Sequence, residues 1–213
     1  MSITILITLI LAYLIGAIPT SVWFGKIFYK KDVRQYGSGN AGATNTFRVF
    51  GAVSGIIVLA IDILKGVVAV MLSHIFSLPE MSKENLLFYQ LSLGLIAAIG
   101  HIFPVYLNFK GGKGVATFFG VVLYLFPVAA LICTITFFIV FGITHYVSVG
   151  SILASLAFML TLFFYYAGTH VLPVLVFSIA VPVIIIFTHR KNIQRLLSGS
   201  ENKFHLTRKE KTT

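Results

Sequence analysis

The sequence predicts an all-α integral membrane protein with seven transmembrane helices, its N-terminus outside and its C-terminus in the cytoplasm. Composition carries this fold class: 58% of the 213 residues are hydrophobic, only 10% are charged, and the mean hydropathy is +0.97. One soluble core cannot bury that much apolar surface, so lipid is the expected solvent. A chain of this length has room for about seven spans of roughly 20 residues with short loops. We therefore expect one membrane-embedded domain covering residues 1–213.

Apolar runs bounded by polar residues, Gly or Pro predict where the helices lie. The seven candidates cover residues 3–27, 52–77, 86–105, 114–126, 128–145, 149–167 and 171–188. The two runs on either side of Phe126-Pro127-Val128 are each shorter than the roughly 20 residues of a full span. They are predicted to be two spans. The alternative is one long kinked helix, which would reduce the count to six.

The distribution of Lys and Arg predicts the orientation. With seven spans, the cations of one membrane side are Lys26, Lys30, Lys31, Arg34, Arg48, Lys110, Lys113 and all seven from Arg190 onward. Lys83 falls on the other side. Because basic loops face the cytoplasm, the basic side is predicted to be cytoplasmic, and Met1 and the 78–85 loop external. With six spans the basic tail would face outward, so the charges favour seven.

The net charge of +10 is therefore interpreted as a topology signal, and no nucleic-acid partner is expected. Residues 190–213 are predicted to form a basic cytoplasmic tail, disordered beyond about Glu201. The single cysteine, Cys133, lies in an apolar run and is expected to serve packing. The chain contains no cluster of metal-ligating residues, so no metal site is expected.

The first glycine-bearing segment reads GSGNAGATNTFR from Gly37 to Arg48 and matches the dinucleotide fingerprint G-x-G-x-x-G. The fingerprint indicates a nucleotide only between a buried strand and a helix, and the preceding KKDVRQY is not such a strand. What remains are glycines that can turn N–H groups toward an anion, the hydroxyls of Ser38 and Thr44, and the guanidinium of Arg48. This segment predicts a phosphate site, and the alternative is a flexible interhelical loop.

The second segment, FKGGKGVAT from Phe109 to Thr117, resembles a P-loop but lacks its first glycine and its Ser or Thr after the lysine. It places glycines and Lys113 where a new helix begins, and a helix N-terminus attracts anions. Gly111, Gly112 and Gly114 are thus candidates for anion binding together with Lys113. Lys110 is interpreted as a surface anchor of the positive-inside kind.

The third segment runs from Thr188 to Glu201 and reads THRKNIQRLLSGSE. His189 and Asn192 are three residues apart, so they share one face of a continuing helix and can point into one site. Glu201 is the acid near them in sequence. The alternative is a basic stop at the membrane surface, which is the preferred interpretation for Arg190 and Lys191.

Asp62 and Lys65, placed in the first turns of the second run, have the spacing of a helical ion pair. Ionisable residues inside a span are functional suspects, so this pair is either structural or shapes a site. His101, before Phe103-Pro104, is expected to be structural. Neither aspartate of the chain neighbours a histidine in sequence, and no nucleophile–base–acid triad is predicted. Either the chain is not an enzyme, or its substrate arrives activated.

Together, GSGNAGATNTFRVFG, DILKG, GHIFPVYLNFKGGKGVAT and HRKNIQRLLSGSE resemble the bacterial acyl-phosphate:glycerol-3-phosphate acyltransferase family, PlsY, over nearly the whole chain. The resemblance implies seven spans and transfer of a fatty acyl group from acyl phosphate to the 1-hydroxyl of glycerol 3-phosphate. The products would be lysophosphatidic acid and inorganic phosphate. An acyl phosphate is an activated substrate, so positioning and charge stabilisation could suffice without a triad.

The resemblance also implies roles for individual residues. Ser38, Arg48 and Lys113 would bind phosphate, His189 and Asn192 would orient the substrate, and these five form the expected catalytic set. Ser148 and Ser151 resemble serines of the family in a cytoplasmic turn. The expected substrate-binding set is Ser38, Gly39, Asn40, Thr44, Asn45, Arg48, Gly111, Gly112, Lys113, Gly114, Ser148, Ser151, His189, Asn192 and Glu201. Among these, Asn40, Thr44 and Asn45 would shape the loop.

The expected partners are acyl phosphate, glycerol 3-phosphate and membrane lipid, with no cofactor and no obligate protein partner. The expected location is the bacterial inner (cytoplasmic) membrane, with the active site facing the cytoplasm. The alternative function is a small-solute or anion transporter, in which Asp62 and Lys65 would mark a permeation path. No internal repeat supports that alternative.

Overall fold

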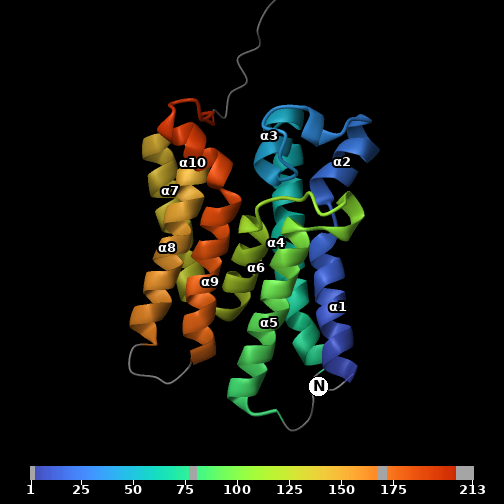
Figure 1. Ribbon diagram of the computed structural model, residues 1–213, viewed down its shortest axis with the longest axis vertical. Coiled ribbons are helices and arrows are strands. Elements are labelled where there is room, and N and C mark those ends of the chain that lie inside the picture. The colour runs from blue at the N-terminus through green and yellow to red at the C-terminus, as the bar shows by residue number, and fades with distance from the viewer. Residues whose placement is uncertain (1–2, 77–80, 167–171, 205–213) are drawn as a thin grey trace, which may run out of the picture.

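The computed structural model describes residues 3–76, 81–166 and 172–204, and these residues form helices joined by loops (Figure 1). The α-helices are α1 (Ile3–Ala17), α2 (Thr20–Tyr29), α3 (Ala43–Phe50), α4 (Ala52–Ile75), α5 (Lys83–Ile102), α6 (Val115–Leu125), α7 (Pro127–Thr144), α8 (Val147–Tyr165), α9 (Leu172–Thr188) and α10 (Arg190–Leu197). Two 3₁₀ turns, η1 (Val33–Gln35) and η2 (Val105–Leu107), complete the order. No strand occurs in the part of the chain described, so the all-α prediction is confirmed there.

The first predicted run, 3–27, forms two helices instead of one. The axes of α1 and α2 are bent by 45° at Pro19, because proline has no backbone N–H and its ring clashes with the preceding turn. The carbonyls of Gly16 and Ile18 at this break accept hydrogen bonds from the ammonium of Lys65, at 3.3 and 2.8 Å. The buried Lys65 ammonium thus supplies hydrogen bonds to backbone carbonyls at the break.

The predicted pair of Asp62 and Lys65 forms, with Nζ 2.8 Å from Oδ1. It lies near the middle of α4 and not in the first turns, because α4 begins at Ala52, where the run was predicted to begin, and Asp62 is ten residues further along. Both residues are buried, 2% and 4% exposed. The Nδ1 atom of His101 on α5 lies 3.3 Å from the same ammonium. The pair therefore ties α4 to α5 and to the α1–α2 break, which supports the structural interpretation.

The two short runs around Phe126 form separate helices, and the alternative of one kinked helix does not describe this structure. The start of α6 follows Lys113, which contacts α10, and the end of α7 is capped by His145, whose carbonyl contacts the chain after α10. The chain therefore leaves this end of the molecule along α6 and returns to it along α7. Pro127 occupies the first turn of α7, where its missing N–H costs no helical hydrogen bond.

Two short helices were not among the predicted runs. α3 packs against α4 and belongs to the segment predicted as a glycine-rich loop. α10 follows α9 after a bend of 59°. Both are strongly amphipathic in sequence, with charges and amides on one side, as expected of helices at a polar end of the molecule.

The lengths of the helices support membrane insertion. Four described helices are long and apolar enough to cross a bilayer: α4, α5 with η2, α7 and α8. The count rises to six if each bent pair, α1 with α2 and α9 with α10, is one span. α6 has 11 residues, roughly 16 Å of helix, which is shorter than the hydrocarbon core of about 30 Å.

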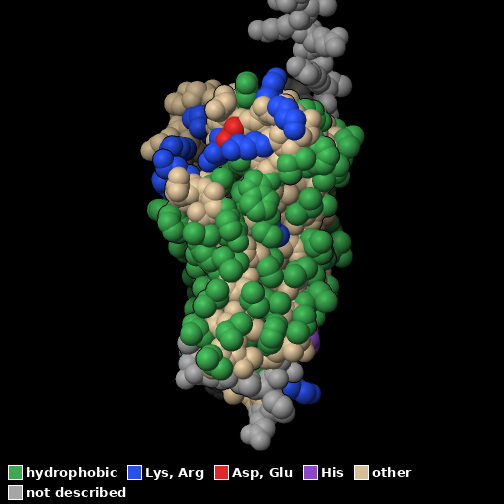
Figure 2. Space-filling view, turned by 90° about the vertical axis from the view of Figure 1, so that its right-hand side faces the viewer, with side chains coloured by type: hydrophobic (Ala, Val, Ile, Leu, Met, Phe, Trp, Pro, Cys, Tyr) green, Lys and Arg blue, Asp and Glu red, His purple; other side chains and the backbone are tan. Residues whose placement is uncertain are grey.

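The surface is consistent with contact to lipid along the length of the helices. Val128, Leu131, Ile135 and Phe138 lie along one face of α7 and are 50–63% exposed. Figure 2 shows hydrophobic side chains along the molecule and Lys and Arg side chains gathered at one end. This basic end carries α2, α3, α10 and the 103–114 and 145–146 connections, while Lys83 begins α5 at the other end (Figure 1).

Candidate active site

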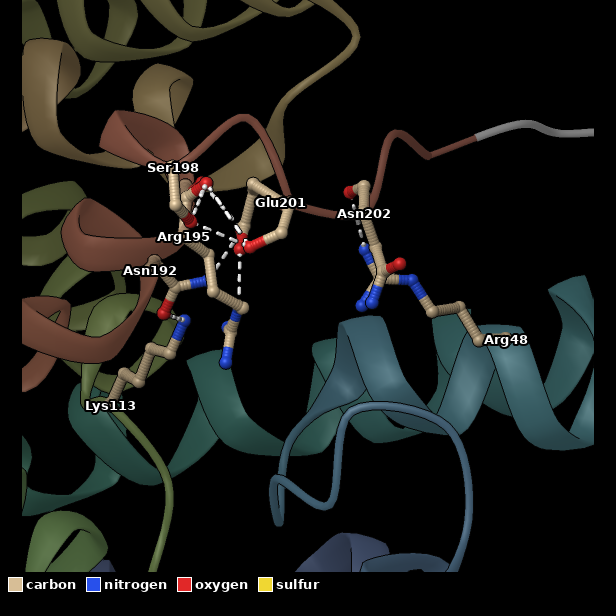
Figure 3. A network of polar contacts seen from close by, with 9 residues as sticks. Arg48, Lys113, Asn192, Arg195, Ser198, Glu201 and Asn202 are labelled. Atoms are coloured by element: carbon tan, nitrogen blue, oxygen red, sulfur yellow. Dashed lines mark hydrogen bonds and ion pairs between the residues drawn. The ribbon is translucent and has the colours of Figure 1, made fainter.

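Lys113 and Asn192 lie in contact at the basic end of the molecule. Lys113 ends the glycine-rich loop before α6, and Asn192 lies in the first turn of α10. The ammonium of Lys113 donates to Oδ1 of Asn192 at 2.6 Å (Figure 3). The hydroxyl of Thr188 donates to the carbonyl of Lys113 at 3.2 Å, which holds the loop against the end of α9. The second and third segments predicted from sequence are therefore brought together.

Glu201 contacts the nitrogen of the Asn192 amide, whose oxygen contacts Lys113. Its Oε1 accepts from Nδ2 of Asn192 at 2.5 Å and from the hydroxyl of Ser148 at 2.9 Å. Its Oε2 accepts from Nε of Arg195 at 2.7 Å. Burial raises the pKa of the Glu201 carboxyl, but these three hydrogen bonds outweigh burial and lower it below its usual value. Glu201 is thus a carboxylate that fixes the orientation of the amide.

Burial is also the main influence on the pKa of Lys113. It lowers the pKa of the ammonium to about 8, because a charged group loses hydration in the protein interior. The charge of Glu201 opposes this effect, and the nearby charges of Arg195 and Arg48 add to it. A cation in such surroundings gains more from an anionic ligand than a solvated lysine does.

Arg48 reaches the site from α3, on the other side of the strap formed by residues 201–204. Its guanidinium donates to the carbonyl of Asn202 at 3.2 Å, and lies 5.9 Å from the centre of the Phe204 ring. Figure 3 shows Arg48 apart from Lys113 and Asn192, with Glu201 and the strap between them. Burial lowers the pKa of Arg48 from its ordinary value, against the opposing charge of Glu201.

Asn45 organises the loop before α3, as expected of a loop-shaping residue. Its side chain is 1% exposed. Its Oδ1 accepts from the backbone N–H of Ser38 at 2.8 Å, and its Nδ2 donates to the carbonyls of Val33 and Tyr36 at 2.9 and 3.1 Å. The N–H of Gly39 donates to Tyr36 as well. Thr44 and Asn40 are half-buried beside this loop.

The second glycine-rich loop is held by the end of α5. The N–H groups of Gly111 and Gly112 donate to the carbonyls of Ile102 and His101, both at 3.1 Å. Glycine N–H groups were expected to face an anion, whereas here those of Gly39, Gly111 and Gly112 donate to protein carbonyls. The side chains near Lys113 are therefore the better candidates for direct contact with phosphate. Gly114, at φ +80°, turns the chain into α6.

His189 is buried at the junction of α9 and α10, with 2% of its surface exposed. Its Nδ1 lies 2.8 Å from the carbonyl of Ile185, so Nδ1 carries a proton and donates. In the neutral ring Nε2 is then an acceptor. Ser151, by contrast, donates back to the carbonyl of Val147 within α8, so of the two predicted serines Ser148 is the one that joins the Glu201 network.

Sequence reasoning did not assign Arg195 or Phe204. Arg195 lies three residues after Asn192 on α10, and this spacing was the available signal for a shared face. Phe204 is an aromatic residue in a polar tail that was expected to be disordered. Both residues contact groups of the predicted site.

Comparison with known proteins decides which family this arrangement belongs to. A family model described as "Glycerol-3-phosphate acyltransferase" matches residues 6–199. The chain belongs to the glycerol-3-phosphate acyltransferase family. A glycerol-3-phosphate acyltransferase of Fusobacterium nucleatum is 47% identical over 197 residues, covering 92% of this chain and 96% of the relative. Glycerol-3-phosphate acyltransferase 2 of Bacillus anthracis is 46% identical over 198 residues, covering 93% and 98%.

Solved structures of the family have the same fold. The crystal structure of PlsY (YgiH), an integral membrane glycerol 3-phosphate acyltransferase, in its glycerol 3-phosphate form has a TM-score of 0.80 and 37% identity, covering 94% of this chain and 96% of that one. Its lysophosphatidic acid form has a TM-score of 0.78. The resemblance to the PlsY family, the acyltransferase class and the integral membrane location are thereby confirmed. The transporter alternative finds no support.

Proposed function

We propose that this protein transfers a fatty acyl group from acyl phosphate to the 1-hydroxyl of glycerol 3-phosphate in phospholipid synthesis. The products are lysophosphatidic acid and inorganic phosphate. Family membership supports the acyl transfer and the acceptor. The observation that carries the proposal is the contact between Lys113 and Asn192, in a polar cluster at the basic end that also includes Glu201 and Ser148.

The chemistry required of the protein is limited, because a mixed anhydride brings its own leaving group. The acceptor hydroxyl oxygen attacks the acyl carbonyl carbon, the bond from that carbon to the phosphate oxygen breaks, and the hydroxyl proton passes to a phosphate oxygen. Both aspartates of the chain face a cation, Asp32 facing Arg34 and Asp62 facing Lys65, and neither is offered as a base. Positioning and charge stabilisation are the roles left to the side chains.

Lys113 and Arg48 are the proposed phosphate ligands, since charge-assisted hydrogen bonds to phosphate are strong. The hydroxyl of Ser38 is a further proposed donor. Asn192 is the proposed orienting group. One N–H of its amide is taken by Glu201 and one lone pair by Lys113, and an amide has a second donor and a second lone pair. It can therefore donate to a phosphate oxygen and accept from the acceptor hydroxyl. His189 supplies Nε2 from a buried position as a further substrate contact.

The proposed setting is the bacterial cytoplasmic membrane, with seven crossings and the active site at the cytoplasmic face. The gathering of Lys and Arg at the end that holds the cluster supports this orientation. In the seven-span arrangement α6 and its flanking turns complete one crossing and α7 the next. No cofactor enters the proposed reaction, and anionic substrates and lipid are the only partners it needs.

Reconstitution of the purified protein in liposomes tests the proposal. Palmitoyl phosphate and glycerol 3-phosphate should yield lysophosphatidic acid and inorganic phosphate in equal amounts. Palmitoyl-CoA should be used at least a hundredfold more slowly, because no segment of the sequence resembles an adenine or pantetheine site. Comparable turnover of the two donors would refute the acyl phosphate assignment and leave the acyltransferase class standing.

A further inference from the structure

The strap after α10, residues 201–204, crosses from α10 to α3 and passes beside the proposed site. Glu201 accepts a hydrogen bond from the Asn192 amide, and the carbonyl of Asn202 accepts one from Arg48. Phe204 is the last residue of the strap. Within it, Asn202 and Lys203 are exposed, whereas Phe204 is buried with 9% of its surface accessible. A buried aromatic residue in a polar segment indicates an anchor.

Phe204 packs between two parts of the molecule that hold different site residues. Its ring centre lies 5.0 Å from that of Phe47 on α3 and 5.8 Å from that of Phe141 on α7. Its backbone N–H donates to the carbonyl of His145, at the end of α7, at 2.9 Å. α3 packs on α2 and α4, while α7 packs on α6 and α8. The ring thus bridges the α3 side, which carries Arg48, and the α7–α10 side, which carries Asn192.

Arg48 is held by this strap at two points. The guanidinium lies 5.9 Å from the centre of the Phe204 ring, within the range of a cation–π contact. One of its five N–H donors is given to the Asn202 carbonyl at 3.2 Å. The guanidinium thus has one contact with the Phe204 ring and one hydrogen bond to the strap backbone. Arg48 is also the neighbour of Phe47 in sequence, so one anchor fixes both the backbone and the side chain.

We propose that Phe204 is a positioning residue for the acyl transfer, which acts by holding the Arg48 guanidinium in the orientation that receives a substrate phosphate. Phe204 itself does not touch substrate in this proposal. The proposal rests on the function given above, because it assumes that Arg48 binds phosphate. It assigns a role to a residue at the far end of the described chain, beyond the 6–199 range of the family match.

A double-mutant cycle tests the coupling. Phe204→Leu keeps apolar volume but removes the aromatic face, and should lower kcat/KM about tenfold. It should raise the KM for the same substrate whose KM is raised by Arg48→Lys. Phe204→Tyr keeps the face and should retain at least half of the activity. In the Arg48→Lys background, Phe204→Leu should change kcat/KM by less than twofold, because the planar group that the ring orients is already absent. Multiplicative effects of the two changes in an active enzyme would overturn the proposal.

Two further comparisons separate positioning from loss of stability. Phe158→Leu, in the core between Phe126 and Phe177, should lower the unfolding temperature without raising that KM. A chain that stops after Phe204 should keep activity within twofold, and a chain that stops after Lys203 should behave like Phe204→Leu. Equal activity of the two shortened chains would contradict the inference. A wild-type protein that makes no lysophosphatidic acid would overturn the proposed function and this inference together.

Discussion

At the residue scale, the Asn192 side chain is held at both ends of its amide. Its oxygen accepts from Lys113 and its nitrogen donates to Glu201, so the two ends of the amide are distinguished by their partners. The Lys113 ammonium can only donate hydrogen bonds, and the Glu201 carboxylate can only accept them. A reversed amide would point its N–H groups at the ammonium and its oxygen at the carboxylate. This arrangement explains why an amide, and not a carboxylate of the same size, occupies the position.

Replacing Asn192 by Asp should be at least as damaging as replacing it by Ala. An aspartate would place a second carboxylate against Glu201, where 2.5 Å now separates the hydrogen-bonded atoms, and beside the substrate phosphates. Like charges in a partly dehydrated site repel strongly. Steady-state rates of the two variants check this. A more active Asp variant, with activity rising through a carboxylate pKa, would favour a general base at residue 192.

Lys113→Ala should lower kcat/KM by about 2–4 kcal/mol of transition-state stabilisation, or roughly 30- to 1000-fold. The matched control is Lys110→Ala, three residues earlier in the same loop. Lys110 is exposed, whereas Lys113 is half-buried and bonded to Asn192. The control should change activity by well under tenfold. Near-normal activity of Lys113→Ala in the liposome assay would remove this residue from the phosphate site.

The pH dependence should reflect the same lysine. Burial lowers the pKa of Lys113 to about 8, so the free enzyme loses the cation as the pH rises through that value. Because kcat/KM reports the free enzyme, it should fall above about pH 8. Lys113→Arg should move this alkaline limb upward by several pH units, because arginine stays protonated. An unchanged limb in the Arg variant would assign the titration to another group.

At the element scale, sequence patterns located the apolar helices but not all of their ends. The break at Pro19 was not predicted in the 3–27 run. A continuous hydrophobic run does not show which donor will bind the backbone carbonyls that a break leaves without helical partners. Lys65, 47 residues later than Ile18, supplies that partner. α3 was missed because its glycine-rich approach resembles a loop, and its helix depends on packing against α4. Pro19 causes the break locally, but the hydrogen bonds from Lys65 that stabilise it, like the packing of α3 on α4, are non-local.

The same limit applies to the candidate site. The predicted binding set contained Lys113, Asn192, Glu201 and Ser148, because their segments bring polar residues to helix ends on the basic side. Which of these residues contact one another was not predicted. Glu201 contacts Ser148 across 53 residues of sequence, and no periodicity relates α8 to the strap. Phe204 was overlooked because the composition of the tail around it favours disorder.

The break between α1 and α2 depends on the buried pair of α4. Lys65→Met should destabilise the fold by about 3–5 kcal/mol, because Asp62 would keep a buried charge without its partner. Lys65→Met combined with Asp62→Asn should be less destabilised than Lys65→Met alone, because no buried charge remains. Thermal unfolding in detergent, followed by circular dichroism, measures both. A double variant with the summed cost of the two single changes would show that the pair is not coupled.

At the scale of the whole molecule, two surfaces of different chemistry meet. Apolar side chains cover the helices along their length, and Lys and Arg gather at the end that holds the site (Figure 2). The substrates in the proposed reaction have the same division, since a fatty chain belongs in lipid and a phosphate belongs in water. A site at the boundary allows the acyl chain to remain in the bilayer while its phosphate meets Lys113 and Arg48.

The orientation of this boundary is open to direct test. Among the described residues, the cations of the basic end lie on α2, α3, α10 and the loops beside them, whereas Lys83 lies at the start of α5. Because Lys and Arg near helix ends are retained in the cytoplasm, this asymmetry should place the C-terminus and the 103–114 connection inside the cell. The 78–85 connection, of which residues 78–80 lie outside the described part, should then be external.

Reporter fusions distinguish this arrangement from its inverse. Alkaline phosphatase, which is active only outside the cytoplasm, should be inactive when fused at the C-terminus and active when inserted near Met81. A fluorescent protein that matures only in the cytoplasm should give the opposite result. The C-terminal fusion alone does not decide the span count, because α9 and α10 lead to the same end whether α6 crosses or not. The side on which the N-terminus lies decides it. Seven crossings require Met1 to be external when the C-terminus is cytoplasmic, since an odd count separates the termini.

Labelling a cysteine at Ser2, in a Cys133→Ser background, with a membrane-impermeant maleimide should therefore succeed in intact cells. Protection of that cysteine, with a cytoplasmic C-terminus, would mean an even number of crossings and would reduce α6 to a helix that enters the membrane without spanning it.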